Sequence, residues 1–128
     1  MENKKVLVVD DEENVRRLLR SMLGNKYIVL EATDGKVAVD IARSQRPDII
    51  LMDLMMPNMD GYTACHAIKQ DPATKAIPIV MVTAVGQELN KKLAKEMGAS
   101  DYITKPFSLR DLLDTIGKFS EYSELGQC

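Results

Sequence analysis

Five polar residues of this chain have types and positions suited to chemistry. They stand at or just after the ends of four short apolar runs: Asp10, Asp11, Asp53, Thr83 and Lys105. If these runs are parallel strands, their carboxyl ends meet at one edge of a sheet, and the polar side chains gather in one crevice. A carboxylate nucleophile, a hydroxyl donor and a lysine that can face phosphate oxygens together outline a site for phosphoryl transfer.

Three carboxylates in one crevice indicate a metal site. Two like charges about 4 Å apart repel by roughly 4 kcal/mol at an effective dielectric of about 20, unless a cation lies between them. Oxygen ligands without thiolate or imidazole select a hard cation, and Mg²⁺ suits a site completed by water and phosphate oxygens. We therefore expect Mg²⁺, with Mn²⁺ as the alternative, at Asp10, Asp11 and Asp53. His66 is the single histidine, so a zinc site with three histidines or a Ser-His-Asp triad lacks its parts.

Each of these polar residues also has an ordinary structural explanation. Asp10 and Asp11 could cap a helix and fill its first turn, and Asp53 could cap a loop. A threonine such as Thr83 often forms a turn at a strand end, and a lysine before proline, such as Lys105, is usually a surface residue. The convergence of all five on one edge favours the chemical interpretation.

The elements that must position these residues alternate along the chain. Apolar runs that suit strands buried on both faces occur at 6–9, 27–30, 49–52, 79–82 and 102–103. Helical spacing occurs at about 15–23, 36–44, 61–69, 87–97 and 108–116. Ser108 followed by Asp111 is a capping pattern for the last helix. Because parallel strands need crossover connections, this alternation predicts an α/β fold with a doubly wound (βα)5 parallel sheet and helices on both faces.

Length and composition limit the classes of function. The chain has 128 residues, enough for one domain with its own core, and its net charge of −2 excludes the strongly basic surface of a direct nucleic-acid binder. We see no run of about 18 apolar residues and no signal-peptide pattern, so we expect a cytoplasmic protein without membrane contact. Cys65 and Cys128 are spaced neither for a disulfide framework nor for a metal, and we expect reduced thiols without a role.

Four segments together resemble the receiver domain of two-component response regulators: VLVVDDE, DIILMDLMMPNMDG, IVMVTA and DYITKPF. The resemblance implies a flavodoxin-like sheet of strand order 2-1-3-4-5. It implies that a histidine kinase or phosphotransfer protein phosphorylates Asp53, with Lys105 and Thr83 in the same site. The expected metal site is Asp10, Asp11, Asp53 and Met55. The expected switch pair is Thr83 and Tyr102, and Pro106 is expected to follow a cis peptide bond.

The same resemblance leads to expectations for the domain limits and the partners. We expect a receiver domain at 1–120, with 121–128 as a C-terminal tail or the start of a linker. Residues 117–128 could be a frayed last helix, the end of a stand-alone protein or the start of a link to an output domain. The expected partners are a kinase docked around Asn14, Val15 and Leu18, and an effector or output domain at the fourth helix, fifth strand and fifth helix. The domain is expected as a monomer or a phosphorylation-dependent dimer.

Two side chains suggest slow loss of the phosphoryl group. Met55 and Val85 stand two residues beyond Asp53 and Thr83, where many relatives carry polar side chains that can hold the attacking water. Met52, Met55, Met56 and Met59 form a methionine cluster that we interpret as core filling and loop surface rather than as a thioether metal site.

Three rival functions fit less well. A haloacid-dehalogenase-like phosphatase has an Asp-x-Asp pattern at its nucleophile, whereas Met55 stands two residues after Asp53. A flavodoxin-like FMN carrier needs a Ser/Thr-rich phosphate loop where this chain has Asp10 and Asp11. A scaffold that is never phosphorylated leaves the full set of site residues unexplained. We therefore expect a phosphoacceptor switch, with self-phosphorylation and autodephosphorylation as its chemistry, rather than an enzyme.

Overall fold

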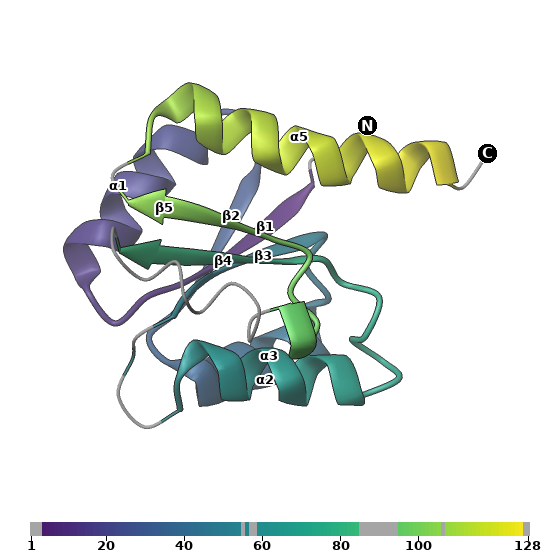
Figure 1. Cartoon of the computed structure of the whole chain (residues 1–128). Helices are drawn as coiled ribbons and strands as arrows, with labels where there is room; N and C mark the ends of the chain where they lie inside the picture. The colour runs from purple at the N-terminus through teal and green to yellow at the C-terminus, as the bar shows by residue number, and fades with distance from the viewer. Residues whose placement is uncertain (1–3, 55, 57–58, 85–94, 106, 127–128) are drawn as a thin grey trace.

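The computed structural model describes residues 4–54, 56, 59–84, 95–105 and 107–126. Five strands and four helices have assigned bounds in these ranges (Figure 1). The strands are β1 (Lys5–Val9), β2 (Ile28–Ala32), β3 (Ile49–Asp53), β4 (Ile79–Ala84) and β5 (Asp101–Lys105). The helices are α1 (Glu13–Leu23), α2 (Gly35–Gln45), α3 (Gly61–Gln70) and α5 (Leu109–Gly126).

The strands form one parallel sheet in the order β2-β1-β3-β4-β5. The predicted strand order is confirmed. Val9 at the end of β1 lies opposite Met52, and Asp53 at the end of β3 lies opposite Val82. This register brings the carboxyl ends of β1 and β3 to the same level, where the chain order along the sheet reverses.

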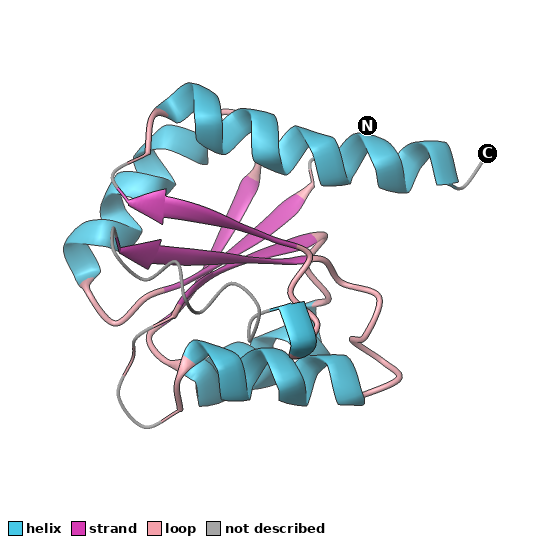
Figure 2. Cartoon of the chain, in the orientation of Figure 1, coloured by secondary structure: helices cyan, strands magenta, loops and turns pink. Residues whose placement is uncertain are grey.

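Helices cover both faces of the sheet, which is the central layer in Figure 2. α1 and α5 lie on one face, while α2 and α3 lie on the other (Figure 1). The side chains of β1 alternate between two cores: Val6 and Val8 pack in the cluster that includes Leu19 and Leu23 of α1, whereas Leu7 and Val9 pack on the opposite side. All five residues of β3 are buried. Burying each large aliphatic side chain contributes about 1.5–3 kcal/mol, so the central strands hold the site edge firmly.

All five strands extend past the apolar runs that predicted them at one end or both, and β2 and β5 show how charged residues are accommodated. β2 ends at Ala32 rather than at residue 30, because the carboxylate of Glu31 is ion-paired with Arg16 and Arg20 and its charge does not interrupt pairing. β5 runs to Lys105 rather than to residue 103, because the Lys105 ammonium group is ion-paired at the site edge. A charged residue ends an apolar run in the sequence without ending the strand.

The helix ends follow local capping chemistry. Asp60 accepts a hydrogen bond from the Thr63 amide before α3, and the Ser108 hydroxyl accepts one from the Asp111 amide before α5. The predicted cap at Ser108 is confirmed. The expected helix at 87–97 lies largely outside the described residues.

The last described helix reaches beyond the expected domain limit. α5 passes residue 120 without a break and continues to Gly126. Within the described part of the chain, every helix is too short or too polar to cross a bilayer.

Candidate functional site

The two central carboxylates of the site lie at the carboxyl edge of neighbouring strands. Asp10 directly follows β1 and is 2% exposed, and Asp53 is the last residue of β3 and is 8% exposed. Thr74 is the other buried polar residue of the described ranges. An ionised carboxylate that is taken out of water needs a cation or hydrogen-bond donors to compensate. Both acids therefore require partners.

Lys105 supplies one such partner from the far end of the chain. Its ammonium nitrogen lies 3.4 Å from Asp10 Oδ2 and 3.9 Å from Asp53 Oδ1. Strand β5 places this nitrogen over the site although two strands separate β5 from β1 in the sheet. The predicted convergence of Asp10, Asp53 and Lys105 is thus present in the structure.

Each polar atom of Asp10 has a partner. Its backbone amide donates to the Ala32 carbonyl at 3.1 Å, and its carbonyl accepts from Arg16 Nη1 at 2.8 Å. Its Oδ1 accepts from the Glu12 amide at 2.9 Å, and Lys105 pairs with its Oδ2. The helix-cap interpretation of Asp10 is partly right, because the side chain binds a backbone amide, although that amide belongs to Glu12 just before α1.

A group of three acids stands where the chain leaves β1. Asp10, Asp11 and Glu12 can each turn one carboxylate oxygen toward a common point, with these oxygens within 4.8 Å of one another. Asp10 is buried, while Asp11 and Glu12 are exposed. Glu12 was not among the predicted site residues. Its position directly after Asp11 is the sequence feature that could have indicated it. The donors are all carboxylate oxygens, so the group fits a hard divalent cation and not a thiolate-seeking metal.

Gly61 brings the start of α3 against the end of β3. Its amide donates to the Leu54 carbonyl at 3.0 Å. A Cβ atom at this position would lie 2.5 Å from the Asp53 carbonyl oxygen and 2.7 Å from the Met81 methyl carbon. A side chain at residue 61 would therefore push on the backbone that carries Asp53, which explains the glycine.

Some of the remaining predicted site residues lie within the described ranges, and others lie outside them. Thr83 belongs to β4 and lies opposite Thr104 of β5 in the sheet register. Tyr102 is half-buried and packs against the core cluster on the α2 and α3 side. Met55, Val85 and Pro106 lie outside the described residues, and so do most of the residues expected in the fourth helix.

Three methionines near Asp53 in the sequence and the thiol of Cys65 belong to the core packing. Met52 is fully buried, and Met56 and Met59 pack against the same core, as the core-filling interpretation predicts. Cys65 is a free, buried thiol whose Sγ donates to the Met97 carbonyl at 3.4 Å. Burial raises the pKa of Cys65 to about 11, so the group is protonated at neutral pH.

Comparison with known families decides the class of the protein. The family described as "Response regulator receiver domain" matches residues 6–117. The chain belongs to this family. As a receiver domain of a two-component response regulator, it is a phosphoacceptor switch rather than a catalytic enzyme. The predicted family and function are confirmed.

Curated relatives of this receiver domain are longer proteins. The chain is 41% identical over 124 residues to the alkaline phosphatase synthesis transcriptional regulatory protein PhoP of Bacillus subtilis, covering 96% of this chain and 51% of the relative. It is 47% identical over 103 residues to the response regulator PleD of Caulobacter vibrioides, covering 80% of this chain and 23% of that protein. The receiver domain thus spans about half or less of these relatives.

Solved structures share the fold over most of the chain. The chemotaxis protein CheY4 of Vibrio cholerae superposes with a TM-score of 0.87 at 33% identity, covering 92% of this chain and 99% of that one. The receiver domain of sensor histidine kinase PA1611 from Pseudomonas aeruginosa superposes with a TM-score of 0.85 at 30% identity, covering 92% and 98%. That domain holds a magnesium ion coordinated in its active site cleft. The α/β receiver fold is therefore shown by sequence and structure together.

Proposed function

We propose that Asp53 of this receiver domain accepts a phosphoryl group from a histidine kinase or phosphotransfer protein, in a reaction that depends on Mg²⁺. The observation that carries the proposal is the position of Lys105, whose ammonium nitrogen is 3.9 Å from Asp53 and 3.4 Å from Asp10. A lysine that faces two buried carboxylates is poised to face the oxygens of an incoming phosphoryl group as well.

Asp53 is the nucleophile of the proposed reaction. One Asp53 carboxylate oxygen forms a bond to phosphorus while the bond from phosphorus to the donor nitrogen breaks, and that nitrogen keeps the bonding electron pair. Lys105 neutralises charge on the phosphoryl oxygens, and Thr83 donates its hydroxyl hydrogen to one of them. Because Asp53 is 8% exposed, most of the surrounding water is excluded from the bond that forms.

The proposed metal ligands are the carboxylates of Asp10, Asp11 and Asp53 and the backbone carbonyl oxygen of Met55, because Mg²⁺ takes oxygen ligands rather than a thioether. The oxygen-only donor set at Asp10 and Asp11 supports Mg²⁺, with Mn²⁺ as the alternative. The structure of the PA1611 receiver domain, which is 30% identical, holds a magnesium ion in its active site cleft, and this also supports the choice of metal. When bound, such an ion neutralises the acids and polarises the phosphoryl oxygens.

Phosphorylation by a small donor tests the assignment. Incubation with acetyl phosphate and Mg²⁺ should add the mass of one phosphoryl group to the wild type, and chelation of the metal should prevent the addition. Asp53→Asn should remove the added mass. Asp40→Asn, which makes the same change on the exposed surface of α2, is the matched control and should be phosphorylated like the wild type. Unchanged phosphorylation of Asp53→Asn would show that another residue is the acceptor.

The proposed switch links Thr83 to Tyr102. A phosphoryl oxygen draws the Thr83 hydroxyl inward, and the vacated space lets the half-buried Tyr102 ring take a more buried rotamer. β4 and β5 pair directly, with Met81 opposite Tyr102 and Thr83 two residues further along β4. Beryllofluoride with Mg²⁺ should shift the Tyr102 ring signals in NMR spectra of the wild type. Ring signals that stay in place while the Asp53 amide responds would reject the coupling.

We propose one surface for binding the kinase and another for binding the output partner. The exposed side of α1, with Asn14 and the 52% exposed Leu18, is the proposed kinase dock. The output face includes β5 and α5 and addresses an effector protein or an output domain, as the greater length of the PhoP and PleD relatives suggests. The domain itself is proposed to span 1–120, as a monomer or a phosphorylation-dependent dimer.

A further inference from the structure

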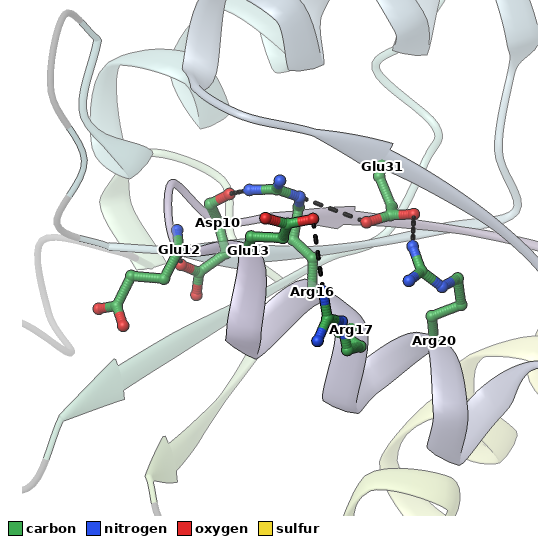
Figure 3. A network of polar contacts seen from close by, with 7 residues as sticks. All are labelled: Asp10, Glu12, Glu13, Arg16, Arg17, Arg20 and Glu31. Carbon is green, nitrogen blue, oxygen red and sulfur yellow. Dashed lines mark hydrogen bonds and ion pairs between the residues drawn. The ribbon is translucent and has the colours of Figure 1, made fainter.

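A network of arginine contacts ties α1 to the backbone of the site (Figure 3). Arg16 donates from Nη1 to the Asp10 carbonyl at 2.8 Å and from Nε to Glu31 Oε1 at 3.3 Å. Arg20, one turn later, donates to the other oxygen of Glu31 at 2.6 Å. The Arg16 side chain is 13% exposed, whereas that of Arg20 is 50% exposed. Arg16 is thus the member of the network that reaches the site.

The contact with the Asp10 carbonyl acts on two acids at once. This oxygen belongs to the peptide unit that joins Asp10 to Asp11, and that unit is planar and rigid. Holding the oxygen therefore sets the direction in which the chain leaves Asp10 and enters Asp11. The Ala32 carbonyl holds the amide on the other side of Asp10 at 3.1 Å. Arg16 and β2 together clamp the backbone that presents the two acids.

Glu31 fixes the orientation of Arg16. The guanidinium group is planar, with its donors in a fixed fork, so a bond from Nε to Glu31 also sets the direction of Nη1. Glu31 lies in β2 opposite Val8 of β1, and Arg20 restrains its second oxygen. The Asp10 carbonyl is therefore held in place relative to β2 through the side chains of Arg16 and Glu31.

The positive charge of Arg16 is electrostatically unfavourable next to a cation site. Its effect on metal affinity can therefore distinguish a positioning role from a charge effect. A guanidinium group next to the Asp10 peptide unit repels a divalent ion, so Coulomb interaction alone predicts tighter metal binding without it. A positioning role predicts the opposite sign. The two explanations can therefore be separated by the direction of one measured change.

We propose that Arg16 is a positioning residue for the cation site, which it serves by holding the Asp10–Asp11 peptide unit in the orientation that lets both carboxylates face one ion. The proposal rests on the metal site assigned under the proposed function. It concerns affinity for the ion, and it is separate from the identity of the phosphorylated residue.

The alternative is a purely structural role, in which Arg16 only holds α1 against the sheet. Arg20 provides the matched control for that role, because it is the same residue type on the same helix and pairs with the same Glu31. Among the described residues, its side-chain contacts are with Glu31 and do not include Asp10. Arg17 is a second control for charge alone, since its 65% exposed side chain pairs with Glu13 at 3.7 Å. All three substitutions to alanine remove one positive charge from α1.

Calorimetric titration of the metal-free protein with Mg²⁺ alone tests the proposal. Arg16→Ala should weaken binding about three- to tenfold, the range expected when one backbone hydrogen bond is lost. Arg20→Ala and Arg17→Ala should bind Mg²⁺ as tightly as the wild type or slightly more tightly. In NMR spectra of the metal-free protein, the Asp11 and Glu12 amide signals should move in Arg16→Ala and stay in place in Arg20→Ala.

The outcomes separate this inference from the proposed function. Wild-type or tighter Mg²⁺ binding by a folded Arg16→Ala would overturn the positioning role while leaving the metal site intact, and so would equal weakening in Arg20→Ala. Absence of Mg²⁺ binding by the wild type would overturn the metal site and this inference with it. If Arg16→Ala does not fold, Arg16→Met, which keeps the apolar stem and loses the donors, decides by the same criterion.

Discussion

The ammonium nitrogen of Lys105 lies 3.4 Å from Asp10 Oδ2, an ion pair between residues 95 positions apart in the chain. The Asp10 side chain is 3% exposed and that of Lys105 is 28% exposed. The same nitrogen also faces Asp53. In the metal-free domain, Lys105 is therefore the counter-charge of two largely buried acids, in addition to its proposed role toward phosphate.

Replacing this lysine should destabilise the metal-free fold. Lys105→Met leaves the two acids without their shared cation, and we expect the free energy of unfolding to fall by about 1–3 kcal/mol. Mg²⁺ should restore more stability to the variant than to the wild type, because the ion then meets acids without a competing ammonium group. Urea denaturation with and without Mg²⁺ measures both effects.

Lys118 offers the matched control for that experiment. Its nitrogen also lies 3.4 Å from a carboxylate, that of Asp101, but its side chain is 67% exposed. An exposed pair contributes at most about 1 kcal/mol, so Lys118→Met should change little and should respond to Mg²⁺ like the wild type. Equal losses of unfolding free energy in Lys105→Met and Lys118→Met would mean that burial of the Lys105 ion pair does not increase its contribution to stability.

Acid should weaken a contact between α2 and the segment after α3. Asp71 Oδ1 accepts from the Ala73 amide at 2.9 Å, and Oδ2 accepts from Arg43 Nε at 2.9 Å. These hydrogen bonds, the one from Ala73 first, hold the pKa of Asp71 below its usual value. The folded-state pKa is lower than the unfolded one of about 3.9, so this stabilisation is complete above that pH and is lost as the pH falls through the folded-state pKa.

Asp71→Asn should therefore cost stability at neutral pH and cost less in acid. Urea midpoints of the variant and the wild type should differ at about pH 7 and converge as the pH falls through the folded-state pKa of Asp71, below the unfolded value of about 3.9. Asp114→Asn, on the exposed side of α5, is the control for a general change in charge. A difference between Asp71→Asn and the wild type that is constant with pH would contradict the assigned cause.

The fold class, the strands and the residues at the centre of the site were predictable from local pattern. Uninterrupted apolar runs mark strands buried on both faces, and parallel strands present their carboxyl ends at one edge. Asp10, Asp53 and Lys105 stand at the ends of such runs, so their convergence follows once β1 and β3 are neighbours. The strand order itself came from family resemblance, since the spacing of the runs does not determine which strands pair.

Contacts that depend on register and helix rotation were not predictable. Arg16 stands on the polar side of an amphipathic helix, where the sequence pattern predicts a solvated cation. Its contacts with Glu31 and the Asp10 carbonyl arise because α1 lies beside β2 at one particular rotation. The charge of Glu31 also hid the last part of β2, because hydropathy carries no information about an ion pair made 15 residues away.

The buried thiol should resist alkylation in the folded protein. Burial raises the pKa of Cys65 to about 11, so its thiolate fraction at pH 7 is on the order of 10⁻⁴, about 100-fold below that of a free cysteine. In a Cys128→Ser background, iodoacetamide should label Cys65 at least about 100-fold more slowly in buffer than in urea. Labelling in buffer at the rate seen in urea would show that α3 opens readily or that the thiol is exposed.

The lifetime of the phosphorylated domain should be set by two apolar side chains. Hydrolysis needs a water in line with the bond from phosphorus to the Asp53 oxygen, and a polar group beside that path can hold the water in place. Met55 and Val85 stand two residues beyond Asp53 and Thr83 and have no strong hydrogen-bonding group. Loss of one positioning contact of about 1.4 kcal/mol slows a reaction roughly tenfold, so we expect slow decay in the wild type.

Substitution by polar residues tests this control of water. Met55→Asn and Val85→Glu should each speed the loss of the phosphoryl group, by up to about tenfold, because each adds a group that can accept a hydrogen bond from the attacking water. Loss of label is followed by intact-mass measurement at fixed Mg²⁺ after removal of acetyl phosphate. Thr33→Asn, an exposed substitution after β2, should decay like the wild type. Equal or slower decay in both Met55→Asn and Val85→Glu would show that these side chains do not control access of water to the phosphoryl group.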